Sequence, residues 1–244
     1  MQNRGPLVLA TADIHSPHYL MILRSALQKL ERESKNACLI LLAGDIVDKG
    51  RVEAARPVFN LIREHLPSAR IVAVFGNEEY HELEDDFKRA YPEVDWLNDE
   101  YKIYQCDNVS IAIVGTRGSL EKPTSWQRKH MPWLVHVYRE RPHIVRKILR
   151  EAKRESDKVI LLSHYALSKA TIKGEHPAIW PHLYDPAMEA LIREEKPDAA
   201  VHGHAHKGRP YAIVDSVPVY NVALPLNRRI VRVTFKTSLD IFFK

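Results

Sequence analysis

The sequence predicts an α/β fold with a largely parallel central sheet and a second, more antiparallel sheet in the same domain. Two observations support this prediction. Apolar, β-branched runs recur along the early part of the chain as continuous stretches, as expected for strands covered on both faces. Helical patterns separate several of these runs, whereas the last part of the chain is rich in strand patterns and poor in helical ones.

The expected strands are short runs dominated by valine, isoleucine, leucine and alanine. The later runs mix apolar and polar residues more than the early ones do. In chain order the runs are residues 7–11, 38–43, 71–75, 109–114, 158–162, 199–201, 211–214, 217–224 and 230–235.

The expected helices lie between these runs. Leucines recur at intervals of three and four over residues 20–30, with charged residues on the opposite face. Similar patterns predict helices within residues 53–65 and 144–152. Asp185 has the position of an N-cap residue, followed by a proline at the first helical position, and predicts a helix over residues 186–194.

Residues 116–143 do not fit the alternation of strands and helices. This segment contains three prolines, two tryptophans and many cations, and it is too long for an ordinary connection. Composition shows no shift that would mark a linker, so a single domain over residues 1–244 is expected. Within that domain, residues 116–143 are interpreted as a possible cap or substrate rim.

The composition is that of a globular protein, with 45% hydrophobic and 27% charged residues and a net charge of +5. This mild basic excess is compatible with an anionic substrate or nucleic acid but requires neither. No nucleic-acid-binding module is visible. No run reaches the roughly 18 apolar residues of a membrane helix, and the first residues do not resemble a signal peptide.

The two cysteines, Cys38 and Cys106, have neither a C-x-x-C nor a zinc-finger spacing. Cys38 opens an apolar run and is interpreted as a small buried apolar residue. These features lead us to expect a cytoplasmic, reducing environment.

Residues able to bind metal ions follow several expected strands. Carboxyl ends of strands gather ligands in open α/β sheets, so these side chains are expected to share one crevice. Their number is too large for one tetrahedral ion and suits two divalent ions that share a carboxylate. The side chains are Asp13, His15, Asp45, Asp48, Asn77, Glu78, His164, His204 and His206.

The local spacing supports this arrangement. In Asp-x-His and His-x-His the two ligands are two residues apart, which places both on one side of an extended chain. Gly44, Gly76 and Gly203 each precede a candidate ligand, where the chain is expected to leave the sheet and turn sharply.

Read in order, these motifs resemble those of the calcineurin-like metallophosphoesterase superfamily, which are D-x-H, G-D-x-x-D, G-N-H-[ED], a lone His and G-H-x-H. The resemblance covers most of the chain and implies a four-layer α-β-β-α sandwich, with two mixed sheets flanked by helices. The matching residues are Asp13-Ile14-His15, Gly44-Asp45-Ile46-Val47-Asp48, Gly76-Asn77-Glu78-Glu79, His164 and Gly203-His204-Ala205-His206.

The resemblance also implies a role for each matching residue. Asp13, His15 and His206 would hold one ion, and Asn77, His164 and His204 would hold the other. Asp45 would bridge the ions, and Asp48 would act from outside the ligand set by orienting a ligating imidazole. Such mixed ligands admit Mn, Fe, Zn, Ni or Co.

The implied activity is hydrolysis of phosphodiester or phosphomonoester bonds, with a metal-bridging hydroxide as nucleophile. The expected partner is a small phosphate ester or a nucleotide. A non-catalytic scaffold that binds a protein partner is one alternative, which the complete ligand set disfavours. A metal-dependent nuclease is another.

Glu78 departs from the family pattern, in which histidine usually follows the motif asparagine. An ionised glutamate would repel a phosphate oxygen, and it would need a raised pKa to act as an acid. We therefore expect a substrate with a good leaving group, and modestly prefer diesters or nucleotides. Asn77 and Glu78 are the catalytic candidates, and Arg117 and His81 are the substrate-binding candidates.

Overall fold

The structure, a computed structural model, describes residues 6–30, 34 and 36–235. The strands are β1 (Val8–Thr11), β2 (Leu39–Ala43), β3 (Arg70–Val74), β4 (Asp95–Leu97), β5 (Glu100–Cys106), β6 (Val109–Thr116), β7 (Lys158–Ser163), β8 (Ala199–His202), β9 (Tyr211–Val214), β10 (Val217–Asn221) and β11 (Val231–Val233). The α-helices are α1 (Leu20–Gln28), α2 (Arg56–His65), α3 (Glu84–Ala90), α4 (Ser125–His130), α5 (Leu134–Glu155), α6 (Pro186–Glu195) and α7 (Leu224–Asn227). Short 3-10 helices are η2 (Val52–Ala55), η3 (His81–Leu83) and η4 (Pro177–His182).

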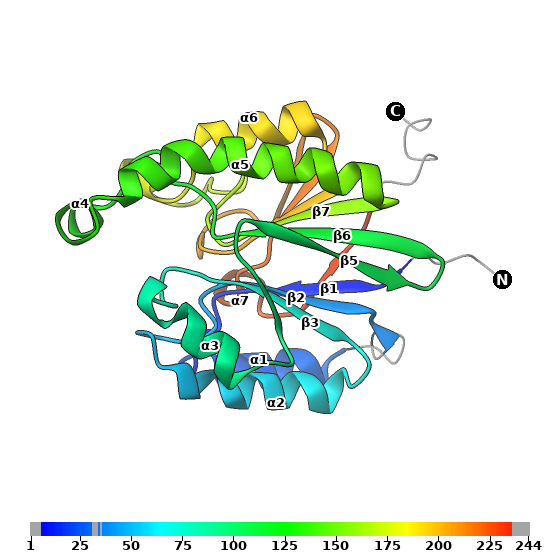
Figure 1. Ribbon diagram of the computed structural model, residues 1–244. Helices are drawn as coiled ribbons and strands as arrows, with labels where there is room; N and C mark the ends of the chain where they lie inside the picture. Colours follow the sequence, from blue (N-terminus) through cyan, green and yellow to red (C-terminus); the bar gives the residue numbers. More distant parts are fainter. Residues whose placement is uncertain (1–5, 31–33, 35, 236–244) are drawn as a thin grey trace.

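Two sheets stack face to face and helices cover the outer face of each, which confirms the four-layer sandwich (Figure 1). The first sheet has the order β11-β1-β2-β3-β4, and only β11 runs antiparallel to its neighbour. The second has the order β5-β6-β7-β8-β10-β9. Its four central strands, β6, β7, β8 and β10, are parallel to their neighbours among these four, and the edge strands β5 and β9 are antiparallel to the strands they pair with.

The division of strands between the sheets differs from the expectation. The sequence suggested that the late runs form the second sheet alone, but that sheet also contains β5, β6, β7 and β8. The last run crosses back to the first sheet, where Val233 pairs with Val8. Strands β4 and β5 were not predicted, because β4 is only three residues long and most side chains of the edge strand β5 are not buried.

Three layers of apolar side chains separate the four layers of backbone. Leu9, Ile40 and Ile71 point from the first sheet toward α1, α2 and α3, whereas their chain neighbours point toward the second sheet. A third cluster lies between the second sheet, α5 and α6. Because the central strands are covered on both faces, their sequences are continuous apolar runs rather than alternating ones.

Helix α5 begins at Leu134, well before the predicted start, and contains Pro142. A proline cannot donate the hydrogen bond that would close onto the carbonyl four residues earlier. The hydroxyl of Ser119 lies 2.7 Å from that carbonyl, on Tyr138, and can donate to it instead. With α4 and the first part of α5, much of the segment 116–143 is helical.

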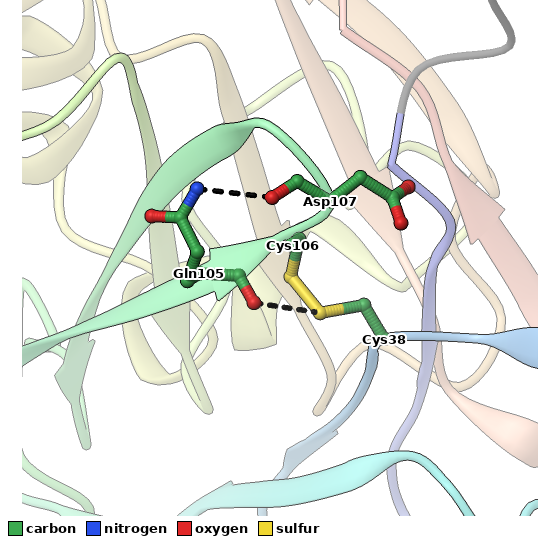
Figure 2. Close-up of a disulfide and its surroundings, with 4 residues drawn as sticks. All are labelled: Cys38, Gln105, Cys106 and Asp107. Atoms are coloured by element: carbon green, nitrogen blue, oxygen red, sulfur yellow. Dashed lines mark hydrogen bonds between the residues drawn. A yellow bond between two sulfur atoms is a disulfide. The ribbon is translucent and has the colours of Figure 1, made fainter.

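The two cysteines form a disulfide, so the interpretation of Cys38 as a simple apolar residue is wrong (Figure 2). Cys38 precedes β2 in the first sheet and Cys106 ends β5 in the second, so the bond joins the two sheets. Disulfides persist mainly in oxidising compartments and in intracellular proteins of hyperthermophiles. The reducing cytoplasmic location therefore stays a prediction that this bond does not favour.

Removal of the disulfide should destabilise the fold substantially. The bond closes a loop with a sequence separation of 68 residues, and constraining such a loop in the unfolded chain contributes about 4 kcal/mol. For a protein of this size we expect reductant, or the double variant Cys38→Ser/Cys106→Ser, to lower Tm by roughly 10 °C. Calorimetry with and without dithiothreitol measures this, and an unchanged Tm would show that the bond does not constrain the fold.

Within the described residues, none of the helices combines the length and the apolar character needed to cross a membrane.

Candidate metal centre

The predicted aspartate and histidine ligands converge on the carboxyl ends of strands from both sheets. Loops after β1, β2 and β3 meet loops after β7 and β8. In each of two groups the potential ligand atoms lie within 4.8 Å of one another. The first group is Asp13, His15 and His206, and the second is Asp45, His164 and His204.

Asp45 lies between the two groups. Its Oδ2 is 3.6 Å from His15 Nε2 in the first group, and its Oδ1 is 3.5 Å from His164 Nε2 in the second. The carboxylate is almost completely buried. A carboxylate that faces one group with each of its oxygens is placed to serve as a ligand shared by two ions.

Beside the second group, two atoms that can only accept a hydrogen bond face each other, one on His164 and one on Asn77. His164 Nδ1 lies 2.9 Å from the carbonyl of Ala43, which fixes the proton on Nδ1 and leaves a lone pair on Nε2. His164 Nε2 lies 3.0 Å from Asn77 Oδ1. The amide nitrogen of Asn77 donates to the Glu78 carboxylate, so it is the amide oxygen of Asn77 that faces His164. Lone pairs at this distance repel each other unless a cation lies between them, so these residues fit a metal ion.

In the first group, one buried imidazole nitrogen lacks a hydrogen-bond partner among the described residues. That nitrogen is Nε2 of His15. Asp13 is fully buried, and its carboxylate accepts the backbone N–H of His204 and lies 3.0 Å from His206 Nε2. An orphaned imidazole nitrogen beside a buried carboxylate fits a divalent ion that binds both.

The electrostatics of the site also favour bound cations. Burial lowers the pKa of His15, lowers that of His164 strongly and lowers that of His204 to about 3, so these imidazoles are neutral, the form that ligates metals. Burial, followed by the nearby Glu79 and Asp13, raises the pKa of Asp45 well above its usual range. Bound dications would reverse that effect and keep Asp45 ionised.

Several ligands have left-handed backbone conformations. The φ angles are 56° at Asp13, 42° at His15, 48° at Asp45 and 67° at His204. Such residues cost on the order of 1–3 kcal/mol each and persist where the surrounding structure over-determines them. Here Asp13 N donates to the carbonyl of Gly44 and His15 N to that of Asp45, so the first two ligand loops hold each other in place.

Two glycines make these loops possible for different reasons. Gly44 has a φ of +80°, which a side chain rarely tolerates, as expected for a sharp turn after β2. Gly76 is not in the left-handed region, but a Cβ there would lie 2.1 Å from Asp45 Oδ1. Close approach of the shared carboxylate, rather than the expected turn, therefore requires glycine at position 76.

A sequence model of the calcineurin-like phosphoesterase family matches residues 6–208. The chain belongs to this family. Members of the family are dimetal-dependent, and in this chain the candidate ligands form two groups. No curated protein matches the sequence significantly.

Solved structures support the same fold. The phosphopantetheinyl hydrolase of Mycobacterium tuberculosis is similar with a TM-score of 0.73 and 15% identity, over 93% of this chain and 95% of the hydrolase. A putative 5'-nucleotidase from Staphylococcus aureus has a TM-score of 0.62 and 14% identity, over 96% of this chain and 51% of its own. A dimetal phosphatase from Danio rerio has a TM-score of 0.57 and 12% identity, over 95% and 99%. At these identities the similarity shows the fold alone.

Glu79 organises the loops of this candidate metal centre and was not singled out from the sequence. Its fully buried carboxylate accepts the backbone N–H groups of Asp45 at 2.9 Å, Val47 at 3.0 Å and Gly76 at 2.7 Å. It therefore joins the loop after β2 to the loop after β3. The only sequence signal was its place at the acidic position of the third family motif.

Asn221, at the end of β10, was also missed. Its amide nitrogen donates to the carbonyl of Ala205 at 2.7 Å, between the ligands His204 and His206. Its amide oxygen accepts the N–H of Ala223. The sequence placed this residue inside a longer strand, whereas β10 runs parallel to β8 and ends beside the histidine loop.

Glu78 and Asp48 lie beside the candidate ligands but belong to neither of the two groups. The carboxylate of Glu78 accepts the N–H of Lys49 at 2.8 Å, and its own N–H donates to Asp45 Oδ1 at 2.8 Å. Asp48 lies 3.4 Å from His18 and 3.3 Å from Arg51 rather than against a ligating imidazole. The imidazole of His164 is oriented by the Ala43 carbonyl instead. The catalytic role of Glu78 and the supporting role of Asp48 stay predictions.

Arg117 is buried rather than exposed on a substrate rim. Its guanidinium is 1% exposed, pairs with Glu84 at 2.6 Å and donates to the carbonyl of Glu79 at 3.0 Å. Burial opposes ionisation of Glu84, but His81 and Arg117 outweigh it and lower the pKa of Glu84 to about 2. His81 lies 3.1 Å from the same carboxylate. Substrate binding by Arg117 and His81 stays a prediction, although both side chains line the cavity beside the ligands.

Proposed function

We propose that this chain is a di-metal-dependent hydrolase that cleaves phosphodiester or phosphomonoester bonds in a small molecule or nucleotide. The observation that carries the proposal is the buried Asp45, which presents one oxygen to each group of ligand atoms. The phosphatase and hydrolase names of two similar structures also support phosphoester chemistry.

The residues divide by their position. Asp13, His15 and His206 would hold one divalent ion; Asn77, His164 and His204 would hold the other; Asp45 would bind both. When bound, such ions supply hydroxide at neutral pH and neutralise charge on the phosphate.

The chain's own groups would fix this arrangement in advance. The backbone N–H of Glu78 orients Asp45, and the Ala43 carbonyl fixes the tautomer of His164. Preorganised ligands of this kind need no rearrangement when substrate binds. The carboxylate of Glu78 stands where the family usually has an imidazole, so we propose that the preferred substrates have leaving groups that depart without a proton from this position.

The complete set of ligands among the described residues does not favour the alternative of a non-catalytic scaffold.

A metal-reconstitution screen tests the proposal. The protein, stripped with chelator, would be loaded separately with Mn, Fe, Zn, Ni or Co, and its metal content measured by mass spectrometry. We expect two ions per chain and hydrolysis of an aryl phosphomonoester or diester that chelator abolishes. Cyclic nucleotides and single-stranded DNA would extend the screen. Two bound ions without turnover of any of these substrates would contradict the enzymatic function.

A further inference from the structure

A cavity of about 840 Å³ adjoins the second group of ligands. Asn77 and His204, both candidate ligands, form part of its wall, so the cavity is continuous with the proposed reaction site. Cavities of 300–1,000 Å³ enclose ligands of drug-like size. The space is therefore suited to more than the phosphoryl group itself.

The side of the cavity formed by α4 and the turn after it is aromatic and apolar. We call Trp126, His130, Met131 and Trp133 the aromatic wall. The side chains of Trp126 and Trp133 are 61% and 47% exposed, which is unusual for such large apolar groups. Trp126 stacks on His130 with ring centroids 4.9 Å apart, and Trp133 lies edge-on to His81 at 5.0 Å. Each of these indole rings is therefore packed against an imidazole in a defined orientation.

The aromatic wall is held in place by hydrogen bonds. Thr124 and Gln127 form a capping box at the start of α4, with bonds of 2.9 and 3.1 Å. The amide nitrogen of Gln127 also donates to the hydroxyl of Tyr138 on α5 at 3.2 Å. A wall fixed in this way loses little conformational freedom when a flat ligand binds.

The charges in the cavity disfavour an anionic occupant. Among the described residues that form its wall, Arg117 is the only lysine or arginine, and its charge is paired with Glu84. The wall also contains the carboxylates of Glu78 and Glu82.

The other lysines and arginines of the segment 116–143 add no positive charge to the wall of the cavity. Arg141 is buried against Asp99. The remaining cations are exposed and lie outside the cavity wall; they are Lys122, Arg128, Lys129 and Arg139.

We propose that this cavity receives the leaving group of the phosphoester, and that the leaving group is an uncharged alcohol carrying a planar aromatic ring or heterocycle. Phenols belong to this class, as do nucleosides whose departing oxygen receives its proton from a group other than Glu78. The inference rests on the proposed phosphoesterase function, which places the reacting phosphate beside Asn77 and His204. It disfavours nucleic acid and polyphosphates as substrates, because both would bring further negative charge toward Glu78 and Glu82.

Binding of the alcohol alone tests the site without any turnover. Calorimetry would measure 2-naphthol and adenosine binding to the metal-free protein and to the double variant Trp126→Ala/Trp133→Ala. Stacking contributes roughly tenfold or more per ring, so we expect the double variant to bind at least about 10-fold more weakly. Ile213→Ala is the matched control, because it removes an exposed apolar side chain from β9 that does not form this cavity. Equal affinities of the wild-type protein and the double variant for these alcohols would overturn the inference.

A charged probe tests the electrostatic part of the inference. 2-Naphthol-6-sulfonate has the same ring system and one added negative charge, and it should bind at least several-fold more weakly than 2-naphthol. Equal or tighter binding of the sulfonate would overturn the assignment of an uncharged leaving group.

Inhibition of the metal-loaded enzyme connects the cavity to the reaction. Phenylphosphonate should inhibit more strongly than methylphosphonate, and Trp126→Ala/Trp133→Ala should reduce that ratio by about 10-fold. An active enzyme whose ratio does not change would overturn the inference while leaving the proposed function intact. Tryptophan-dependent binding of 2-naphthol without hydrolysis under any metal would overturn the proposed function instead.

Discussion

Replacement of Asp45 by asparagine is expected to lower kcat by at least about 1000-fold. Loss of a bound ion would remove several kcal/mol of transition-state charge stabilisation, and each 1.4 kcal/mol corresponds to about tenfold in rate. The neutral amide cannot present an anionic oxygen to both ligand groups, which approach Asp45 at 3.6 and 3.5 Å. We also expect one ion fewer per chain, measured by mass spectrometry together with steady-state kinetics at saturating metal.

Asp48→Asn is the matched control for this experiment. Asp48 lies in the same loop, but its carboxylate contacts His18 and Arg51 rather than a candidate ligand. We expect Asp48→Asn to lower kcat by no more than about 10-fold, which is the lower end of the effects seen for residues that support metal ligands. If Asp45→Asn retained both ions and substantial activity, Asp45 would not be the shared ligand.

Glu79→Ala is expected to destabilise the fold by about 4 kcal/mol, since each unpaired buried donor costs about 1–3 kcal/mol. The variant would leave the backbone N–H groups of Asp45, Val47 and Gly76 without an acceptor in a fully buried position. Loss of a like charge beside Asp45 would offset part of this cost, because Glu79 raises the pKa of Asp45. Urea unfolding of the metal-free protein measures the net effect.

Glu78→Ala provides the comparison for Glu79→Ala. The adjacent carboxylate is only partly buried and accepts one backbone N–H, from Lys49. We expect its removal to cost less than about 1 kcal/mol. Glu79→Gln keeps one acceptor oxygen and should be intermediate, which covers the case in which the alanine variant does not fold. Similar stability of all three variants would show that Glu79 does not organise the two loops.

The fold was largely predictable because its central strands are buried on both faces. Runs such as residues 38–43 and 158–162 are recognisable without alternation, and their order indicates the layered α/β architecture. The edge strand β5 was missed because only Tyr104 and Cys106 along it are buried. The early start of α5 was missed because Pro142 suggests a helix break, and its compensation by Ser119 depends on tertiary structure.

The candidate ligands were predictable because they follow strand ends in recognisable motifs. Glu79 and Asn221 were not, because they act on backbone groups of loops that only the fold brings together. The environment of Arg117 depends on Glu84, from another part of the chain, and so could not be read from its position after β6. The disulfide was missed for the same reason, since its cysteines are 68 residues apart and have no diagnostic spacing.

The aromatic wall comes from one continuous stretch of chain between β6 and α5, whereas the candidate metal ligands come from loops after β1, β2, β3, β7 and β8. Mutations can therefore change the aromatic wall and the candidate metal ligands independently. Insertions, deletions or an exchanged cassette within residues 120–133 would alter the wall without changing a single candidate ligand. This separation gives the scaffold a route to new substrate preferences, in nature or in the laboratory, in which the hydrolytic centre is inherited intact.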